Sequence, residues 1–310
     1  MPSWRGSTAS GAIPVSETSA LLRFRTRDGF VLRGYLVTAA AGTDTPVLLQ
    51  IHGSLGHFLA RGTPRLLPHA LQARGIHSLS INTRLASTGQ MTSAGIFDDT
   101  RWDLEAAAGF LTGEGFRNIF VLGYSLGAAM VIHWAARQTH PSVRGLVLEG
   151  VAYSLPDSHR RRANAWGSTP SYDALAAQAR ALLGDDPSRS SDDQIVVVYG
   201  SRGPSRAPEH SEIFTYRTWW HMVGPEARAA MAYRHVGATT LPLLMMRGEH
   251  DPLVEDWEPE ALARLAREAG NAHVRVTEIP GAGHDCMENA DRMLQEIGDW
   301  LGRYARPAGS

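Results

Sequence analysis

The chain has 310 residues, of which 43% are hydrophobic and 20% charged, as is usual for globular proteins. Its net charge of −1 provides no basic field, which argues against nucleic acid or a membrane surface as a partner. The one cysteine, Cys286, excludes an internal disulfide, so folding needs no oxidising compartment.

The N-terminal segment is rich in Ser, Thr, Gly and Ala, and residues 1–19 are predicted to be a flexible leader. This segment lacks the apolar stretch of an export signal, and no apolar run in the chain is long enough to span a bilayer. We therefore expect a cytoplasmic protein that consists of one α/β domain with an insertion.

A β-hairpin is predicted first, because segments 21–27 and 30–37 flank the turn sequence Asp28-Gly29. After it, apolar runs typical of buried strands alternate with helical segments. The strands are expected at 46–51, 76–81, 118–122, 143–147, 241–246 and 273–279, and helices at 98–111 and 128–136. Such alternation predicts an α/β fold with a mostly parallel sheet that helices cover on both faces.

The sequence Gly-Tyr-Ser-Leu-Gly at 123–127 lies between a predicted strand and a predicted helix. In this setting a G-x-S-x-G pattern is typical of a sharp turn that exposes the central serine at the sheet edge. Side chains at Gly123 and Gly127 would collide with neighbouring backbone in such a turn. The pattern alone is weak, since a glycine-rich turn can contain it by chance. Its setting makes Ser125 the candidate nucleophile.

Two later loops offer the partners that a serine hydroxyl needs, which are a base and a group that orients the base. Asp251 follows the strand predicted at 241–246, and His284 follows the strand predicted at 273–279. Small residues flank His284 and allow its ring to reach over the sheet edge. The chain order Ser125, Asp251, His284 is that of hydrolases built on such a sheet.

These features resemble the α/β-hydrolase fold superfamily, in particular its esterase-like serine hydrolases. The resemblance extends over roughly residues 21–305. It rests on Gly-Tyr-Ser-Leu-Gly at 123–127, His-Gly-Ser at 52–54, Gly-Glu-His-Asp at 248–251 and Gly-Ala-Gly-His at 281–284. It implies an oxyanion hole formed by the backbone N–H groups of Ser54 and Leu126. The scaffold hosts many reactions, so the resemblance selects no single substrate.

The resemblance also implies a cap over the active site. About ninety residues between the strand near 143–151 and that at 241–246 break the alternation of strands and helices. We assign 155–236 to a cap inserted after the sixth core strand, between the core segments 1–154 and 237–310. Within the cap, helices are expected at 172–183 and 225–234 and a strand at 194–200.

Four aromatic residues of the insertion are candidates for the walls of a substrate pocket that favours a bulky or apolar group: Trp166, Tyr216, Trp219 and Trp220. Aromatic clusters also form the cores of small domains, so these residues could instead be the cap's own core. Both interpretations stay open.

Other polar residues near the strand ends have a structural and a functional interpretation. Glu149 is a less favoured position for the triad acid, with pairing to Arg84 as its structural role. Arg84 could bind an anionic substrate, although we favour an anchoring role through Asp98 or Asp99. His52 is expected to brace its loop, because only one histidine can serve the nucleophile.

The function implied is hydrolysis of a carboxylic ester of a small molecule through an acyl-enzyme, with Ser125, His284 and Asp251 as the triad. No cofactor or metal is expected, and the oligomeric state is left open, with a homodimer as one option. A thioesterase, an amide hydrolase or a C–C bond hydrolase could use the same residues. A ligand-binding receptor with little turnover is the alternative from a different class.

Overall fold

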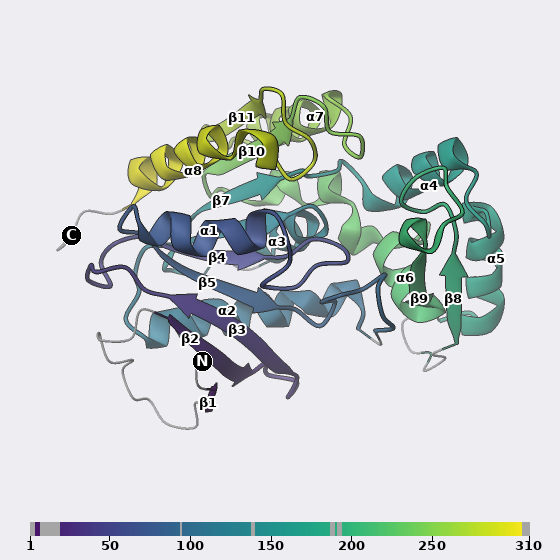
Figure 1. Ribbon diagram of the computed structural model, residues 1–310, viewed down its shortest axis with the longest axis horizontal. Coiled ribbons are helices and arrows are strands. Elements are labelled where there is room, and N and C mark those ends of the chain that lie inside the picture. Colours follow the sequence, from purple (N-terminus) through teal and green to yellow (C-terminus); the bar gives the residue numbers. More distant parts are fainter. Residues whose placement is uncertain are drawn as a thin grey trace.

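The computed structural model describes residues 4–6, 19–93, 95–137, 140–186, 190 and 194–305 (Figure 1). Most of the expected leader, 1–19, lies outside the described residues. Within it, Trp4–Gly6 forms strand β1, which pairs in parallel with β2 (Ser19–Arg25).

In the described part of the chain, nine strands form the central sheet in the order β1-β2-β3-β5-β4-β6-β7-β10-β11. The further strands are β3 (Val31–Val37), β4 (Val47–Ile51), β5 (His77–Asn82), β6 (Ile119–Tyr124), β7 (Val143–Glu149), β10 (Leu243–Gly248) and β11 (Val274–Ile279). Strand β3 runs antiparallel to β2 and β5, and the other neighbours are parallel. The predicted mostly parallel α/β fold is confirmed.

Helices cover both faces of the sheet (Figure 1). One face carries α1 (Thr63–Gln72) and α8 (Ala290–Tyr304), and the other carries α2 (Thr100–Gly113), α3 (Leu126–Ala135) and α7 (Trp257–Glu268). In β4, Leu48 belongs to the core under α1 and α8, whereas Leu49 belongs to the core on the opposite face. Burial on both faces explains why the strands are continuous apolar runs.

An insertion follows β7, which is the sixth core strand when counting starts at β2. It contains α4 (Leu155–Trp166), α5 (Tyr172–Leu183), β8 (Ile195–Val198), β9 (Glu212–Thr215) and α6 (Tyr216–Val223). Strands β8 and β9 form a separate antiparallel pair, and these elements lie together at one end of the molecule in Figure 1. The boundaries 155 and 236 stay a prediction.

The helix expected at 225–234 is wrong. Short 3-10 turns occupy this part of the chain, at Arg228–Ala230, Ala232–Arg234 and Val236–Ala238. Met231 has an extended backbone (φ −94°, ψ 93°) and separates the first two turns. Ala230 and Ala232 on either side of it are fully buried. Packing therefore overrides the helical propensity of the alanines.

No helix within the described ranges has both the length and the apolar character needed to cross a membrane.

Candidate active site

Ser125 occupies a strained turn between β6 and α3, with φ 54° and ψ −116°. A Cβ atom at Gly123 would lie 2.3 Å from the carbonyl oxygen of Gly127. A Cβ atom at Gly127 would lie 2.6 Å from the carbonyl oxygens of Ile51 and His52. The turn is therefore so tight that only glycine fits at positions 123 and 127, two residues before and two residues after Ser125.

The structure brings the three predicted catalytic side chains together. His284 Nε2 lies 2.8 Å from the Ser125 Oγ, and His284 Nδ1 lies 2.7 Å from Asp251 Oδ2. An ionised carboxylate only accepts hydrogen bonds, so Nδ1 carries the ring proton and donates a hydrogen bond to Asp251. Nε2 is then free to accept the hydrogen of the Ser125 hydroxyl.

Asp251 is built to stay ionised although its side chain is fully buried. Burial raises its pKa, but the hydrogen bond from His284 and the electrostatic interaction with its ring lower it. The backbone N–H groups of Leu253 and Val254 also donate to Oδ1, at 2.8 and 3.1 Å. These partners hold the pKa of Asp251 below its usual value of 3.8, because each of them stabilises the charged form.

Glycines let the triad loops pack directly against one another. A Cβ atom at Gly248, before the acid, would lie 2.0 Å from the carbonyl oxygen of Gly283, before the histidine. A Cβ atom at Gly150, which has a φ of 61°, would lie 2.8 Å from Cε1 of His284. Because these two positions have no side chains, the imidazole fits between the end of β7 and the loop that contains Asp251.

The loop after β4 lies against the nucleophile. A Cβ atom at Gly53 would be 3.1 Å from the Cβ of Ser125. Leu55 has a φ of 60° and donates its N–H to the Thr88 carbonyl at 2.9 Å. Among the residues that the structure describes, the N–H groups of Ser54 and Leu126 have no protein acceptor. Both amides are thus free to bind a ligand atom.

His52 braces this loop and does not reach the nucleophile. The Thr83 N–H donates to His52 Nε2 at 3.2 Å, so the ring proton is on Nδ1, which lies 2.9 Å from the Gly53 carbonyl oxygen. Burial lowers the pKa of His52 to about 4. The ring is therefore neutral at pH 7 and serves as a structural hydrogen-bond bridge, as the sequence predicted.

Glu149 is fully buried at the end of β7 but is not bonded to His284. Its Oε1 accepts from the Thr63 hydroxyl at 2.9 Å, and its Oε2 has no partner in the described part of the chain. Burial, with the nearby Asp285 and Asp251, raises the pKa of Glu149 well above its usual 4.5. Because this carboxyl is bonded to Thr63 while Asp251 is bonded to His284, Glu149 does not match the role of triad acid.

The expected pair between Glu149 and Arg84 is wrong. Arg84 instead lies 2.9 Å from Asp28, 2.8 Å from Asp103 and 3.6 Å from Asp99. These three carboxylates surround the guanidinium because the hairpin turn and the start of α2 meet there. Arg84 is thus an anchor for its loop, which was the interpretation we favoured.

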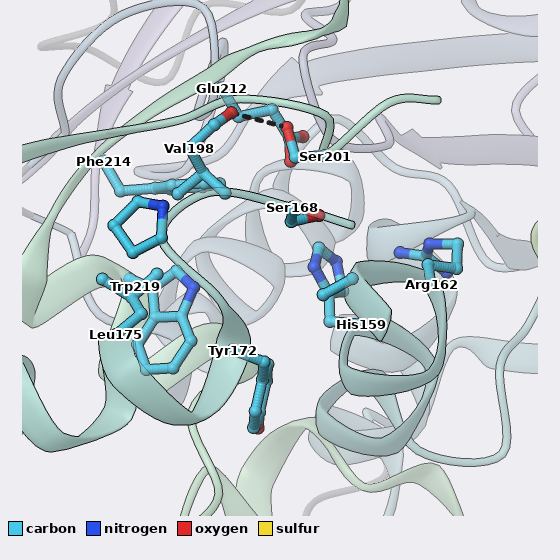
Figure 2. Close-up of a pocket in the computed structure, with 12 residues that line it drawn as sticks. His159, Arg162, Ser168, Tyr172, Leu175, Val198, Ser201, Glu212, Phe214 and Trp219 are labelled. Carbon is cyan, nitrogen blue, oxygen red and sulfur yellow. Dashed lines mark hydrogen bonds between the residues drawn. The ribbon is translucent and has the colours of Figure 1, made fainter. Parts of the chain in front are cut away.

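The four candidate aromatic residues have different surroundings. Trp219 lines a cavity in the insertion, where its ring centre lies 5.3 Å from that of Tyr172 (Figure 2). Tyr216 donates to Gln178 at 3.1 Å, and the Arg180 guanidinium lies 5.0 Å from the Trp220 ring centre, so both face α5. Trp166 ends α4 and is not part of the cavity wall.

Trp219 and Trp220 are each only 3% exposed, and both belong to the hydrophobic core. The aromatic run therefore forms much of the insertion's core, and Trp219 contributes to both the core and the cavity. Sequence reasoning missed the polar wall of this cavity, which includes His159, Arg162 and Glu212. Its one signal was the basic run at 160–162. No group of three or more potential metal ligands occurs in the ranges described.

Comparison with known proteins shows the family and the fold of this chain. The family model described as serine aminopeptidase, S33, matches residues 47–291. A search of curated proteins found no match. An esterase from Pyrococcus furiosus is 17% identical, with a TM-score of 0.63 over 98% of this chain and 97% of that one.

Two further solved structures are similar. The α/β-hydrolase GrgF from Penicillium sp. sh18 is 16% identical, with a TM-score of 0.66 over 93% of this chain and 99% of that one. Est1E from Butyrivibrio proteoclasticus, with ferulic acid bound, is 16% identical, with a TM-score of 0.59 over 89% of this chain and 96% of that one. At such identities the likeness shows the fold alone.

Proposed function

Because the chain belongs to the serine aminopeptidase S33 family and has the α/β-hydrolase fold, we propose that it is a serine hydrolase that cleaves a carboxylic ester of a small molecule. One observation carries this proposal. Ser125, His284 and Asp251 are joined by two hydrogen bonds of 2.8 and 2.7 Å. Ser125 also occupies a strained turn, and such a conformation persists where the surrounding structure enforces it.

In the first half-reaction, Ser125 Oγ attacks the ester carbonyl while His284 Nε2 takes the hydroxyl proton. Asp251 holds the imidazole in the required tautomer and stabilises the imidazolium that forms. The charge that develops on the carbonyl oxygen is bound by the N–H groups of Ser54 and Leu126. Each donor of this kind typically lowers the barrier by about 3 kcal/mol. His284 then protonates the alcohol, which leaves.

In the second half-reaction, water occupies the place of the alcohol. His284 removes a proton from this water as it attacks the acyl-enzyme, and it returns that proton to Ser125 Oγ. The products are the acid and the free enzyme. All proton transfers use one imidazole, and the described triad needs no further titratable group.

An ester is the proposed substrate because the similar structures include the Pyrococcus furiosus esterase and Est1E, the latter with ferulic acid bound. The family description names an aminopeptidase, so amides belong in the same test. A serine at position 125 argues against dehalogenase or epoxide hydrolase chemistry, which needs a carboxylate nucleophile. We also assign residues 155–236 to a cap and the segments 1–154 and 237–310 to the catalytic core.

The first test is labelling by a fluorophosphonate probe, which reacts with activated serines. We expect labelling of the native protein and of Ser54→Ala, and no labelling of Ser125→Ala. Ser54→Ala is the matched control because it removes a nearby hydroxyl and keeps the backbone amide. An unlabelled native protein that binds a small apolar ligand would instead support a receptor.

The second test is a panel in which one acyl group is presented as an activated ester, a thioester and an amide. We expect kcat/KM to be highest for the ester. This quantity is compared because its ratio between two substrates measures how well the enzyme discriminates between their transition states. A higher value for the thioester or the amide would show that this class, and not the ester, is the substrate. The assignment of the triad would not change.

A further inference from the structure

The cap contains a cavity whose wall is half apolar and half polar (Figure 2). Trp219, Tyr172 and Phe214 provide the apolar side, and His159, Arg162 and Glu212 are among its polar residues. Apolar and polar side chains therefore face one shared space.

Arg162 is the unusual residue of this wall. Its Nη1 donates to the Ser158 hydroxyl at 2.5 Å and to the Leu253 carbonyl at 3.4 Å. Among the described residues, no carboxylate oxygen lies within 4.0 Å of its guanidinium. Burial lowers the pKa of Arg162 to about 10, so it is still charged at pH 7. The charged guanidinium of Arg162 is thus partly buried, and no carboxylate in the described ranges is bonded to it.

The two preceding arginines of α4 are paired. Arg160 lies 3.1 Å from Asp173, and Arg161 lies 2.9 Å from Glu258. Asp173 belongs to α5 and Glu258 belongs to α7. All three arginines belong to the same helix, so Arg162 lacks a carboxylate partner in the described part of the chain because of the cavity that it faces.

The charged side chains at the cavity are Arg162 and Glu212 in its wall and Arg202 beside Glu212. Glu212 is 2% exposed, and its Oε2 has no partner in the described residues. Its nearest cation is Arg202, whose Nη1 lies 3.9 Å from Oε1. Burial raises the pKa of Glu212 and lowers that of His159, so both shifts favour the neutral forms. Glu212 is thus the one acidic residue among the described lining residues, with Arg162 in the same wall and Arg202 beside it.

The cavity adjoins the catalytic loops. Leu253, whose carbonyl accepts from Arg162, donates its own N–H to Asp251 Oδ1 at 2.8 Å. On the other side, a Cβ atom at Gly89 would lie 3.2 Å from Glu212 Oε1 and 2.6 Å from Leu55 Cδ2. Leu55 directly follows Ser54. The cavity wall is therefore joined to the loop of Asp251 through Leu253, and to the loop of Ser54 through Gly89 and Leu55.

We propose that the cavity binds a carboxylate, and that the substrate is an ester with a second, ionised carboxyl group remote from the scissile bond. Arg162 holds this group and Arg202 adds to the positive field, because a guanidinium matches a carboxylate in charge and in planar geometry. The aromatic side of the cavity contacts the carbon chain or ring between the two ends. This inference rests on the proposed esterase function.

The kinetic test uses p-nitrophenyl half-esters of adipic, suberic and sebacic acid, each against the methyl-terminated ester of equal length. We expect the native enzyme to prefer the acid at one chain length by tenfold or more in kcat/KM. Arg162→Gln should reduce this preference by about 10- to 100-fold, since it removes a charge-assisted hydrogen bond. Arg160→Gln is the control, because this side chain is 56% exposed on the same helix, and it should keep the preference.

A binding test separates this inference from the proposed function. Suberate is titrated into Ser125→Ala by calorimetry, and into the same protein with Arg162→Gln added. We expect binding that weakens tenfold or more in the double variant. Absence of binding, or equal binding by both proteins, overturns the inference, as does a native preference for neutral esters. If the native protein hydrolysed none of the esters while Ser125→Ala still bound suberate, the esterase function would be overturned and the carboxylate site would stand.

Discussion

The substitution Asp251→Asn tests the catalytic assignment most directly, because the environment of this side chain determines how an amide would fit. Oδ1 accepts two backbone N–H groups, at 2.8 and 3.1 Å, and Oδ2 accepts from His284 at 2.7 Å. Asparagine has one acceptor oxygen and one NH₂ group. The oxygen has to face the two N–H donors, since the NH₂ group would repel them. The NH₂ group then points at His284.

This orientation forces His284 into the wrong tautomer. An NH₂ donor requires an unprotonated Nδ1, so the ring proton moves to Nε2, which lies 2.8 Å from Ser125 Oγ. A protonated Nε2 cannot take the proton of the nucleophile. We expect kcat to fall by about 10⁴-fold, the size associated with the wrong tautomer in a triad. This corresponds to about 5.5 kcal/mol of transition-state stabilisation.

The assay is kcat for one activated ester at pH 7, together with thermal unfolding to confirm the fold. Glu149→Gln is the matched control, because it removes the other buried carboxyl near the triad and keeps an acceptor for Thr63. The control should retain kcat within about threefold of the native value, since it leaves the triad intact. If Asp251→Asn kept activity within tenfold while Glu149→Gln lost it, Glu149 would be the triad acid and our assignment would be wrong.

Three further predictions follow from buried groups. The pKa of Glu149 is raised in the folded state, so native stability falls as pH rises above its unfolded value of 4.5; Glu149→Gln should therefore raise Tm increasingly from pH 5 to 8, and parallel Tm curves would refute this. Gly127→Ala should abolish fluorophosphonate labelling, because its Cβ would lie 2.6 Å from two carbonyl oxygens, whereas Gly109→Ala, with open space around it, should label normally. Cys286 is 0% exposed and burial raises its pKa, so iodoacetamide should modify it only in denaturant, as mass spectrometry would show; rapid modification of the native protein would contradict this.

The core of the fold could be predicted because its signals are local. Strands such as β4 and β6 are buried on both faces, so each is a short apolar run whose ends can be recognised. Parallel strands present their carboxyl ends at one edge, so residues just after them are brought together. The positions of Ser125, Asp251 and His284 follow from this rule, although 159 residues separate the first from the last.

Features that depend on tertiary contacts could not be predicted. The helix expected at 98–111 begins at Thr100, because Phe97–Asp99 forms a 3-10 turn. Asp99 occupies the N-cap position but makes no side-chain capping bond. It is drawn toward Arg84 at 3.6 Å, in the charge cluster that the hairpin turn completes. No pattern within the helix itself reveals this competition.

The run Arg160, Arg161 and Arg162 shows why the substrate is harder to predict than the chemistry. Successive residues of a helix point about 100° apart, so three identical side chains reach three different environments. One pairs with Asp173 on α5, one pairs with Glu258 on α7, and the third faces the cavity. Their partners lie 13 and 97 residues away, beyond any local pattern. Motifs at strand ends therefore predict the reaction, whereas long-range packing decides which arginine lines the cavity that we propose binds a carboxylate.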